Sequence, residues 1–156
     1  MLIPDELYGV VKQSMPIPCV DVMAADRHGR VLMVKRLNPP ARGQWWFPGG
    51  RVHFLEPRPS AALRKLREEC NLQASALIEL GSHDVIFHGA NGDPPSHAIT
   101  TLFAAQIEHP GYLKLDGQSE AAEWRMPRAW VAEPLHPFVV NALMAQGWPD
   151  RLPFKT

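Results

Sequence analysis

The sequence predicts a mixed α/β fold, and three observations support this. Strand-like runs lie on both sides of a central helical stretch, and a second helical pattern closes the chain. Hydrophobic residues make up 46% of the sequence and charged residues 21%, which is typical of a globular protein. A length of 156 residues suits one domain with its own core, so we expect a single domain over residues 1–156.

The first half of the chain has the features of one helix and three strands. We expect a helix or arm over residues 1–15 and strands over residues 19–24, 31–35 and 45–47. The helix has an apolar side made of Leu7, Val10 and Val11, and two prolines follow it. The strands are apolar runs, and the turn-forming sequence DRHG between the first two predicts a hairpin.

The second half begins with a helical pattern. Small and apolar residues recur every three or four positions from Ala61 to Cys70 with charged residues between them, which predicts a helix over residues 60–72. Asn71 can end this helix in a left-handed conformation. We expect strands over residues 77–88, 99–108 and 123–126 and a closing helix over residues 135–146.

Charge and cysteine content limit the classes of function. Lys plus Arg and Asp plus Glu number 16 each, so the net charge is zero, which argues against a broad nucleic-acid-binding face but allows a small basic pocket. Cys19 and Cys70 form neither a disulfide framework nor a zinc signature, which favours packed thiols in a reducing compartment. We find no signal peptide and no long apolar run, and therefore expect a cytoplasmic protein with no membrane partner.

The stretch from Gly49 to Leu72, GGRVHFLEPRPSAALRKLREECNL, carries residues suited to metal chemistry. A Gly-Gly turn leads to a loop acid, Glu56, and a helix follows that carries Arg64, Glu68 and Glu69. Arg64 and Glu68 are one helical turn apart and can form an ion pair. A backbone carbonyl beside carboxylates is an all-oxygen site of the kind that Mg²⁺ requires, and the ion can hold a diphosphate. The alternative is a surface helix with solvated charges.

This stretch resembles the Nudix box, G-x5-E-x7-R-E-U-x-E-E-x-G-U, in which U is a bulky aliphatic residue. Two positions depart from it: Lys65 replaces the Glu that follows the Arg, and Asn71 replaces the Gly. The resemblance implies a Nudix fold (α/β/α), with a mixed β-sheet sandwiched between α-helices, and a hydrolase of nucleoside diphosphates linked to another group. The matching residues are Gly50, Glu56, Arg64, Leu66, Glu68, Glu69 and Leu72.

Within that family the sequence is most similar to the GDP-mannose mannosyl hydrolases, which also dispense with the Glu at position 65. The segment Lys35–Val52, KRLNPPARGQWWFPGGRV, looks much like theirs. The resemblance implies attack at the anomeric carbon and release of GDP and sugar, with Mg²⁺ as cofactor and Mn²⁺ as the alternative. It also implies a homodimer, for which Trp45, Trp46 and the N-terminal arm could supply apolar surface.

The resemblance also implies roles for individual residues. The Gly49 carbonyl, Glu69 and Gln118 would hold the magnesium ion, with Glu68 beside them. In the rest of the site Arg36 and Arg51 would contact the diphosphate, Asp21 would face the sugar, Arg64 would anchor Glu56, and Phe103 stands where a Tyr near the phosphates is expected. The alternatives are surface charge for the two arginines and, for Asp21, an acid on the exposed side of a hairpin.

The general base is left open. The mannosyl hydrolases carry a His directly after the metal-binding Gln, and this sequence has Ser119 there, which has no useful basicity near neutral pH. His88, His97 and Glu120 are candidates, although each could be an ordinary loop or edge residue. Three functions follow: hydrolysis of a nucleotide sugar at the glycosyl carbon, hydrolysis at phosphorus, or binding of a nucleotide sugar without turnover.

Overall fold

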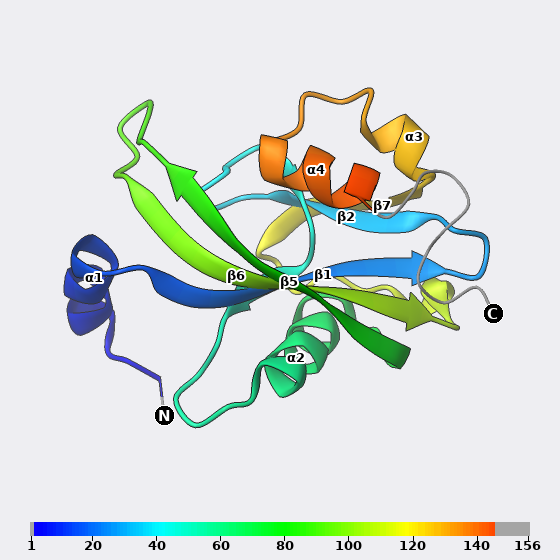
Figure 1. Ribbon diagram of the computed structural model, residues 1–156, viewed down its shortest axis with the longest axis horizontal. Coiled ribbons are helices and arrows are strands. Elements are labelled where there is room, and N and C mark those ends of the chain that lie inside the picture. Colours follow the sequence, from blue (N-terminus) through cyan, green and yellow to red (C-terminus); the bar gives the residue numbers. More distant parts are fainter. Residues whose placement is uncertain (1, 146–156) are drawn as a thin grey trace.

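A computed structural model describes residues 2–145 and confirms the α/β/α fold: one seven-stranded mixed sheet lies between helices (Figure 1). No helix among these residues is long and apolar enough to cross a membrane. The elements are α1 (Asp5–Ser14), β1 (Ile17–Asp26), β2 (Val31–Arg36), β3 (Trp45–Trp46), β4 (Gly49–Arg51), α2 (Arg58–Cys70), β5 (Ala74–Phe87), β6 (Ser96–Ile107), the 3-10 helix η1 (Pro110–Tyr112), β7 (Ser119–Arg125), α3 (Pro127–Trp130) and α4 (Pro137–Ala145).

Strand β1 organises the sheet because it pairs with three other strands. It also carries Asp21, an acid of the candidate site. The main strand order is β3-β2-β1-β6-β5, with β4 also paired to β1 and β7 to β2. β1 runs parallel to β6 along its whole length and antiparallel to β4 and β2. Asp21 lies opposite Gly49 on β4 and Leu102 on β6. The centre of β1 is therefore flanked by the Gly-Gly segment on one side and by β6 on the other.

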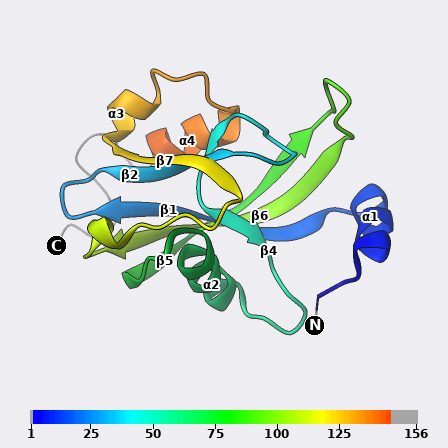
Figure 2. The ribbon, with the colours of Figure 1, turned by 180° about the vertical axis from the view of Figure 1, so that it is seen from behind.

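The two faces of the sheet carry separate hydrophobic cores, because side chains alternate along each strand. On β1, Val22 and Ala24 face α2, whereas Met23 and Ala25 face α4. Leu66 and Cys70 of α2 complete the first core, and α4 completes the second with its residues Phe138, Val139, Ala142 and Leu143. Figure 2 shows α2 covering one face and α3 and α4 the other.

The structure extends most predicted strands and adds elements that the sequence analysis did not predict. α2 begins at Arg58, two residues earlier than predicted, and Asn71 ends it in the left-handed region as predicted, with φ of 57°. Helix α3 was missed because it is four residues long, although its Trp130 is fully buried and donates a hydrogen bond to the Val31 carbonyl. The last predicted residue of the closing helix, Gln146, lies outside the described residues.

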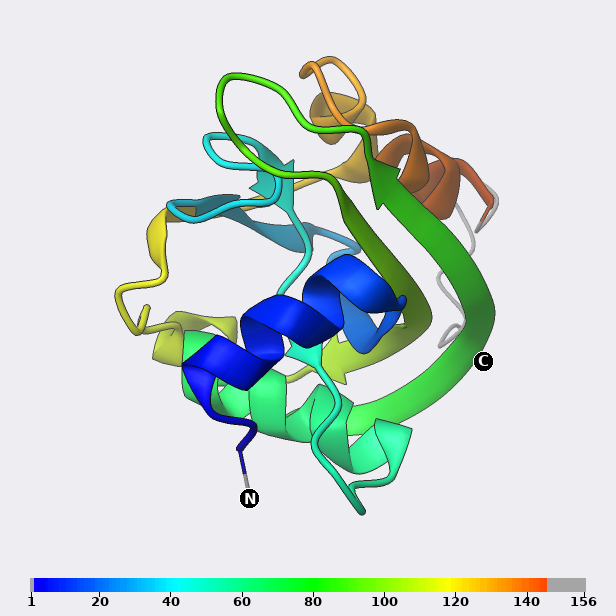
Figure 3. The ribbon, with the colours of Figure 1, turned by 90° about the vertical axis from the view of Figure 1, so that its left-hand side faces the viewer.

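Of the apolar surfaces expected to contribute to a dimer, the N-terminal helix is exposed, whereas the two tryptophans are largely internal. Helix α1 lies beside one end of the sheet (Figures 1 and 3) and buries none of its residues, so its apolar side is not packed against the core. Leu7 and Val10 are 54% and 61% exposed. Trp46 is buried and Trp45 packs on Trp130, so neither offers apolar surface for a dimer. Both tryptophan side chains are therefore packed inside the protomer.

The buried position of Leu66 gives a first prediction. Leu66→Ala should lower the free energy of unfolding by about 2–5 kcal/mol, because it leaves a cavity between α2 and the sheet. Leu63→Ala is the matched control on the same helix: Leu63 is 40% exposed, so its truncation should cost less than half as much. Urea denaturation of the two variants measures the difference, and equal losses would contradict the packing of α2.

Candidate active site

The site is built around Gly49 and Gly50 of β4, which lie very close to residues of neighbouring elements. A Cβ on Gly49 would collide with the Val20 carbonyl oxygen and would lie 2.7 Å from Asp21 Oδ1. A Cβ on Gly50 would lie 2.7 Å from Lys65 Cε on α2. The two glycines thus let β4 pass between Asp21 on one side and Lys65 on the other. A larger residue at Gly49 would collide with the β1 backbone, whereas one at Gly50 would displace the end of the Lys65 side chain.

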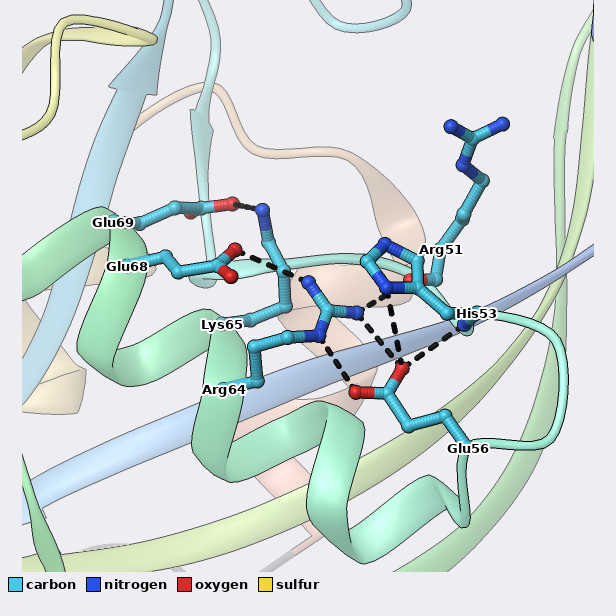
Figure 4. Close-up of polar contacts among 7 residues, drawn as sticks. All are labelled: Arg51, His53, Glu56, Arg64, Lys65, Glu68 and Glu69. Atoms are coloured by element: carbon cyan, nitrogen blue, oxygen red, sulfur yellow. Dashed lines mark hydrogen bonds and ion pairs between the residues drawn. The ribbon is translucent and has the colours of Figure 1, made fainter. Parts of the chain in front are cut away.

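Arg64 fixes the loop between β4 and α2 (Figure 4). Its Nε and Nη2 atoms donate to the two oxygens of Glu56 at 2.6 and 3.0 Å, and Nη2 also donates to the Arg51 carbonyl at 3.0 Å. Its Nη1 atom bonds Glu68 at 3.1 Å, which is the ion pair predicted from their spacing. Arg64 and Glu56 are 13% and 15% exposed. This guanidinium is fully occupied by protein groups, so its role is to position the loop.

The environment of Glu56 strongly favours its charged form. Hydrogen bonds from the Arg64 guanidinium, together with one from the backbone N–H of His53 at 2.9 Å, lower the pKa of Glu56 to about 2. The same contact with Glu56 raises the pKa of Arg64. Glu56 therefore stays ionised at every ordinary pH and binds the loop to the helix.

Glu69 lies on the α2 side of the Gly-Gly passage and is 7% exposed. Its Oε1 atom contacts the ammonium of Lys65 at 2.6 Å, and the backbone N–H of Gly49 lies close enough to the same carboxylate to lower its pKa slightly. Burial raises the pKa of Glu69, the Lys65 ammonium opposes this, and Asp116 is close enough to raise it further. Glu69, Lys65 and the Gly-Gly segment thus form one compact charged group.

The predicted magnesium ligands are only partly assembled. Glu69 and Gly49 are together, but the Glu68 carboxylate is half exposed and bonds Arg64, and Gln118 is exposed at the start of β7. No three His, Cys, Asp or Glu side chains among residues 2–145 converge as a metal cluster. The oxygen donors suit a divalent cation in kind. One oxygen of Glu69, however, already carries the Lys65 ammonium, whose positive charge would repel a cation bound at the other oxygen.

A pocket of about 250 Å³ opens on the other side of β4, lined by Asp21, Arg36, Gly49 and Arg51. The structure therefore brings together the two arginines and the acid that the sequence analysis assigned to the substrate. Arg36 donates to the Pro40 carbonyl at 2.8 Å, which places its guanidinium along the 36–44 loop. No protein carboxylate pairs with either arginine among the described residues.

Asp21 is buried, and each of its carboxylate oxygens accepts one hydrogen bond from the protein. It accepts from Trp46 Nε1 at 2.9 Å and from Thr100 Oγ1 at 2.6 Å. Burial raises the pKa of Asp21 to about 6, although both hydrogen bonds oppose the rise. The sequence alternative, an acid on the exposed side of a hairpin, is excluded by its 7% exposure. A carboxylate held rigidly in a pocket can accept hydrogen bonds from ligand hydroxyls.

Helix α1 contributes to the pocket, which the sequence analysis did not foresee. Tyr8 stacks on Arg51, with the guanidinium carbon 3.9 Å from the ring centroid, and Lys12 also lines the pocket. The Arg51 Nη1 atom is buried without a hydrogen-bond partner in the protein. A lone aromatic residue in an exposed helix gave no sequence signal of this contact.

Several predicted residues lie elsewhere. Phe103 is 2% exposed in the core beneath α2, because its side chain points to the opposite face of β6 from Thr100 and the pocket, so its assignment near the phosphates is wrong. His88 is exposed and lines a separate surface hollow near residues 12–16, which does not support its choice as a catalytic base. His97 reaches the pocket edge but contacts Asp84 at 3.2 Å, and Glu120 pairs with Lys35.

Comparison with known proteins settles the family. The NUDIX domain model matches residues 15–144 of this chain. The chain belongs to the Nudix hydrolase family. The match covers the sheet, both helical layers and the charged group described above.

Two Nudix relatives and one solved structure show the range of the similarity. The chain is 30% identical to the low-salt glycan biosynthesis protein Agl8 of Haloferax volcanii over 92% of this chain and 90% of that one. It is 28% identical to an ADP-ribose pyrophosphatase of Methanocaldococcus jannaschii over 64% and 56% of the two chains. The crystal structure of a MutT NUDIX hydrolase from Burkholderia pseudomallei superimposes with a TM-score of 0.70 and 28% identity, covering 83% of this chain and 97% of that one.

The buried ion pair of the Nudix box predicts a pH-dependent contribution to stability. Because its folded-state pKa of about 2 lies below the usual value of 4.5, Glu56 stabilises the fold above pH 4.5, and this contribution is lost as the pH falls toward 2. Glu56→Gln should therefore lower the free energy of unfolding by roughly 2 kcal/mol at pH 7 and by progressively less below pH 4.5.

Glu79→Gln serves as the control for this measurement. Glu79 pairs with Arg58 at 2.8 Å, but both side chains are about half exposed, so its loss should cost well under ~1 kcal/mol. Urea denaturation at several pH values compares the variants. A Glu56→Gln effect that is constant from pH 7 to pH 3 would contradict the assigned ion pair.

Proposed function

We propose that this protein is a metal-dependent Nudix hydrolase of a nucleoside diphosphate sugar, GDP-mannose or a close relative, that cleaves at the glycosyl carbon. The observation that carries the proposal is the pocket in which Arg36, Arg51 and Asp21 converge beside the Gly-Gly segment. Two guanidinium groups without protein carboxylate partners suit a diphosphate, and a buried acid suits the hydroxyls of a sugar. Full-length similarity to a glycan biosynthesis protein also supports a sugar-linked substrate.

In this proposal the chain's own groups bind and orient the substrate. Arg36 and Arg51 hold the diphosphate leaving group, and their charge offsets the negative charge that builds up on it as the glycosyl bond breaks. Asp21 orients the sugar through its hydroxyls. Mg²⁺, or Mn²⁺ in its place, would be held by Glu69 and the Gly49 carbonyl with Gln118 nearby, and would neutralise further charge on the diphosphate.

Attack at phosphorus is the second candidate, since one relative is an ADP-ribose pyrophosphatase. Retention of Glu68 and Glu69 is compatible with it. Binding without turnover is the third candidate, and the contact between Lys65 and Glu69 favours it because it engages the main predicted metal ligand.

One experiment separates the three functions. The protein is incubated with GDP-mannose and Mg²⁺ in ¹⁸O-labelled water, and the products are analysed by mass spectrometry. We expect GDP and a sugar that carries the label. Label in a nucleoside monophosphate or a sugar phosphate would establish attack at phosphorus, and unchanged substrate that binds in calorimetry would establish a binding role.

Ser119 provides the second test of this function. It lies opposite Arg36, which lines the pocket, in the β2–β7 pairing. Ser119→His should raise the rate of carbon cleavage by ~10²–10⁴-fold, because it restores a general base at the position where the related hydrolases carry one. A limb titrating near the usual histidine pKa of about 6.5 should appear in the pH–rate profile. Glu123→His, an exposed position on the same strand, should change neither quantity.

A homodimer remains part of the proposal, with a revised surface. Since the tryptophans are internal, the exposed apolar side chains of the N-terminal segment would form the contact. These residues are Leu2, Ile3, Leu7, Val10 and Met15.

A further inference from the structure

One of the two residues that depart from the Nudix box, Lys65, is buried. Lys65 stands where the box carries a glutamate, and its side chain is 10% exposed. Lysine is seldom buried unless it has a partner of opposite charge. Here the partner is Glu69, one helical turn along α2, at 2.6 Å from Nζ to Oε1.

Helix stability does not account for this pair. In helices the order Glu then Lys is the more favourable at this spacing, and here Lys precedes Glu. The contact is also buried, where each charge loses its hydration. Such a pair persists only when both charges are held together, and it is costly if either is lost.

The path of the lysine side chain defines where its charge lies. The aliphatic stem passes directly under Gly50, within 2.7 Å of the position that a Cβ there would take. The ammonium then reaches Glu69 Oε1 at 2.6 Å. The positive charge therefore lies between the Gly-Gly segment and Glu69 (Figure 4), beside the groups expected to hold the metal ion.

We propose that Lys65 is a tethered cation that competes with a divalent metal for Glu69. Two cations cannot share one buried carboxylate without strong repulsion, so metal binding requires the ammonium to leave Oε1. Lys65 thereby lowers the metal affinity of the site, and without metal it neutralises the carboxylate. The proposal rests on the metal site of the proposed function and adds that the intrinsic affinity of this site is set by residue 65.

Arg67 offers a matched control on the same helix. It is exposed and carries the same charge two residues further along the chain. Lys65→Gln removes the charge while keeping an amide that can donate a hydrogen bond to Glu69, so the variant should fold. Lys65→Glu goes further and adds a second carboxylate. Arg67→Gln changes the net charge of the protein as much as Lys65→Gln does, but away from Glu69.

The test is titration of each full-length protein with Mn²⁺, with the free ion measured by electron paramagnetic resonance and no substrate present. We expect the dissociation constant to fall by about tenfold in Lys65→Gln, to fall further in Lys65→Glu, and to change less than about twofold in Arg67→Gln. Thermal melting with and without Mn²⁺ should show a larger metal-induced stabilisation in the two Lys65 variants than in the parent.

The outcomes separate this inference from the proposed function. If the parent binds Mn²⁺ as tightly as Lys65→Gln does, the competition is refuted while the metal site stands. If neither the parent nor any Lys65 variant binds Mn²⁺, both the competition and the metal site are refuted. An equal gain in Mn²⁺ affinity in Arg67→Gln would also refute the competition, because the effect would then come from the net charge of the protein alone.

Discussion

The absence of side chains at Gly49 and Gly50 is the constraint on which the rest of the site depends. It allows β4 to approach Asp21 on β1 and Lys65 on α2 at the same time. The sheet, the loop acid, the pocket and the charged helix then meet within a few residues. A larger residue at either position would have to displace a strand backbone or a buried lysine, which the close packing of a protein interior resists.

The three buried or partly buried acids have different environments and therefore different tasks. Glu56 accepts from a guanidinium and a backbone N–H, which lowers its pKa and makes it a structural anion. Asp21 is held by two neutral donors, and burial raises its pKa to about 6. Glu69 pairs with the buried ammonium of Lys65, and burial raises its pKa. Partner charge and burial, more than residue type, distinguish the structural acid from the two that border the functional site.

The basic side chains near the site also differ in whether they have a carboxylate partner. Arg64 donates hydrogen bonds to Glu56, Glu68 and the Arg51 carbonyl, and Lys65 forms an ion pair with Glu69. Arg36 and Arg51 have no carboxylate partner among the described residues, and Tyr8 stacks on Arg51. A protein of zero net charge can thus carry a local excess of positive charge in this pocket, because the nearby basic groups Arg64 and Lys65 are paired with carboxylates.

The sequence by itself determined the fold class, the loop and helix of the Nudix box, and the Arg64–Glu68 pair. These features depend on local spacing, namely helical periodicity and residues one helical turn apart, whereas Gly49 and Gly50, expected in a turn, lie in strand β4. Even the left-handed end of α2 at Asn71 followed from a local preference.

Only the tertiary structure decided which face of each strand the site occupies and where the long side chains end. Phe103 was misplaced because the side of a strand reverses at every residue, so an uncertainty of one position moves a side chain from the pocket to the core. The contact of Tyr8 with Arg51 joins residues 43 positions apart, and the space that the Lys65 side chain occupies depends on the absence of a side chain at Gly50 on β4. Contacts of this kind arise from the packing of distant segments, which composition and spacing do not encode.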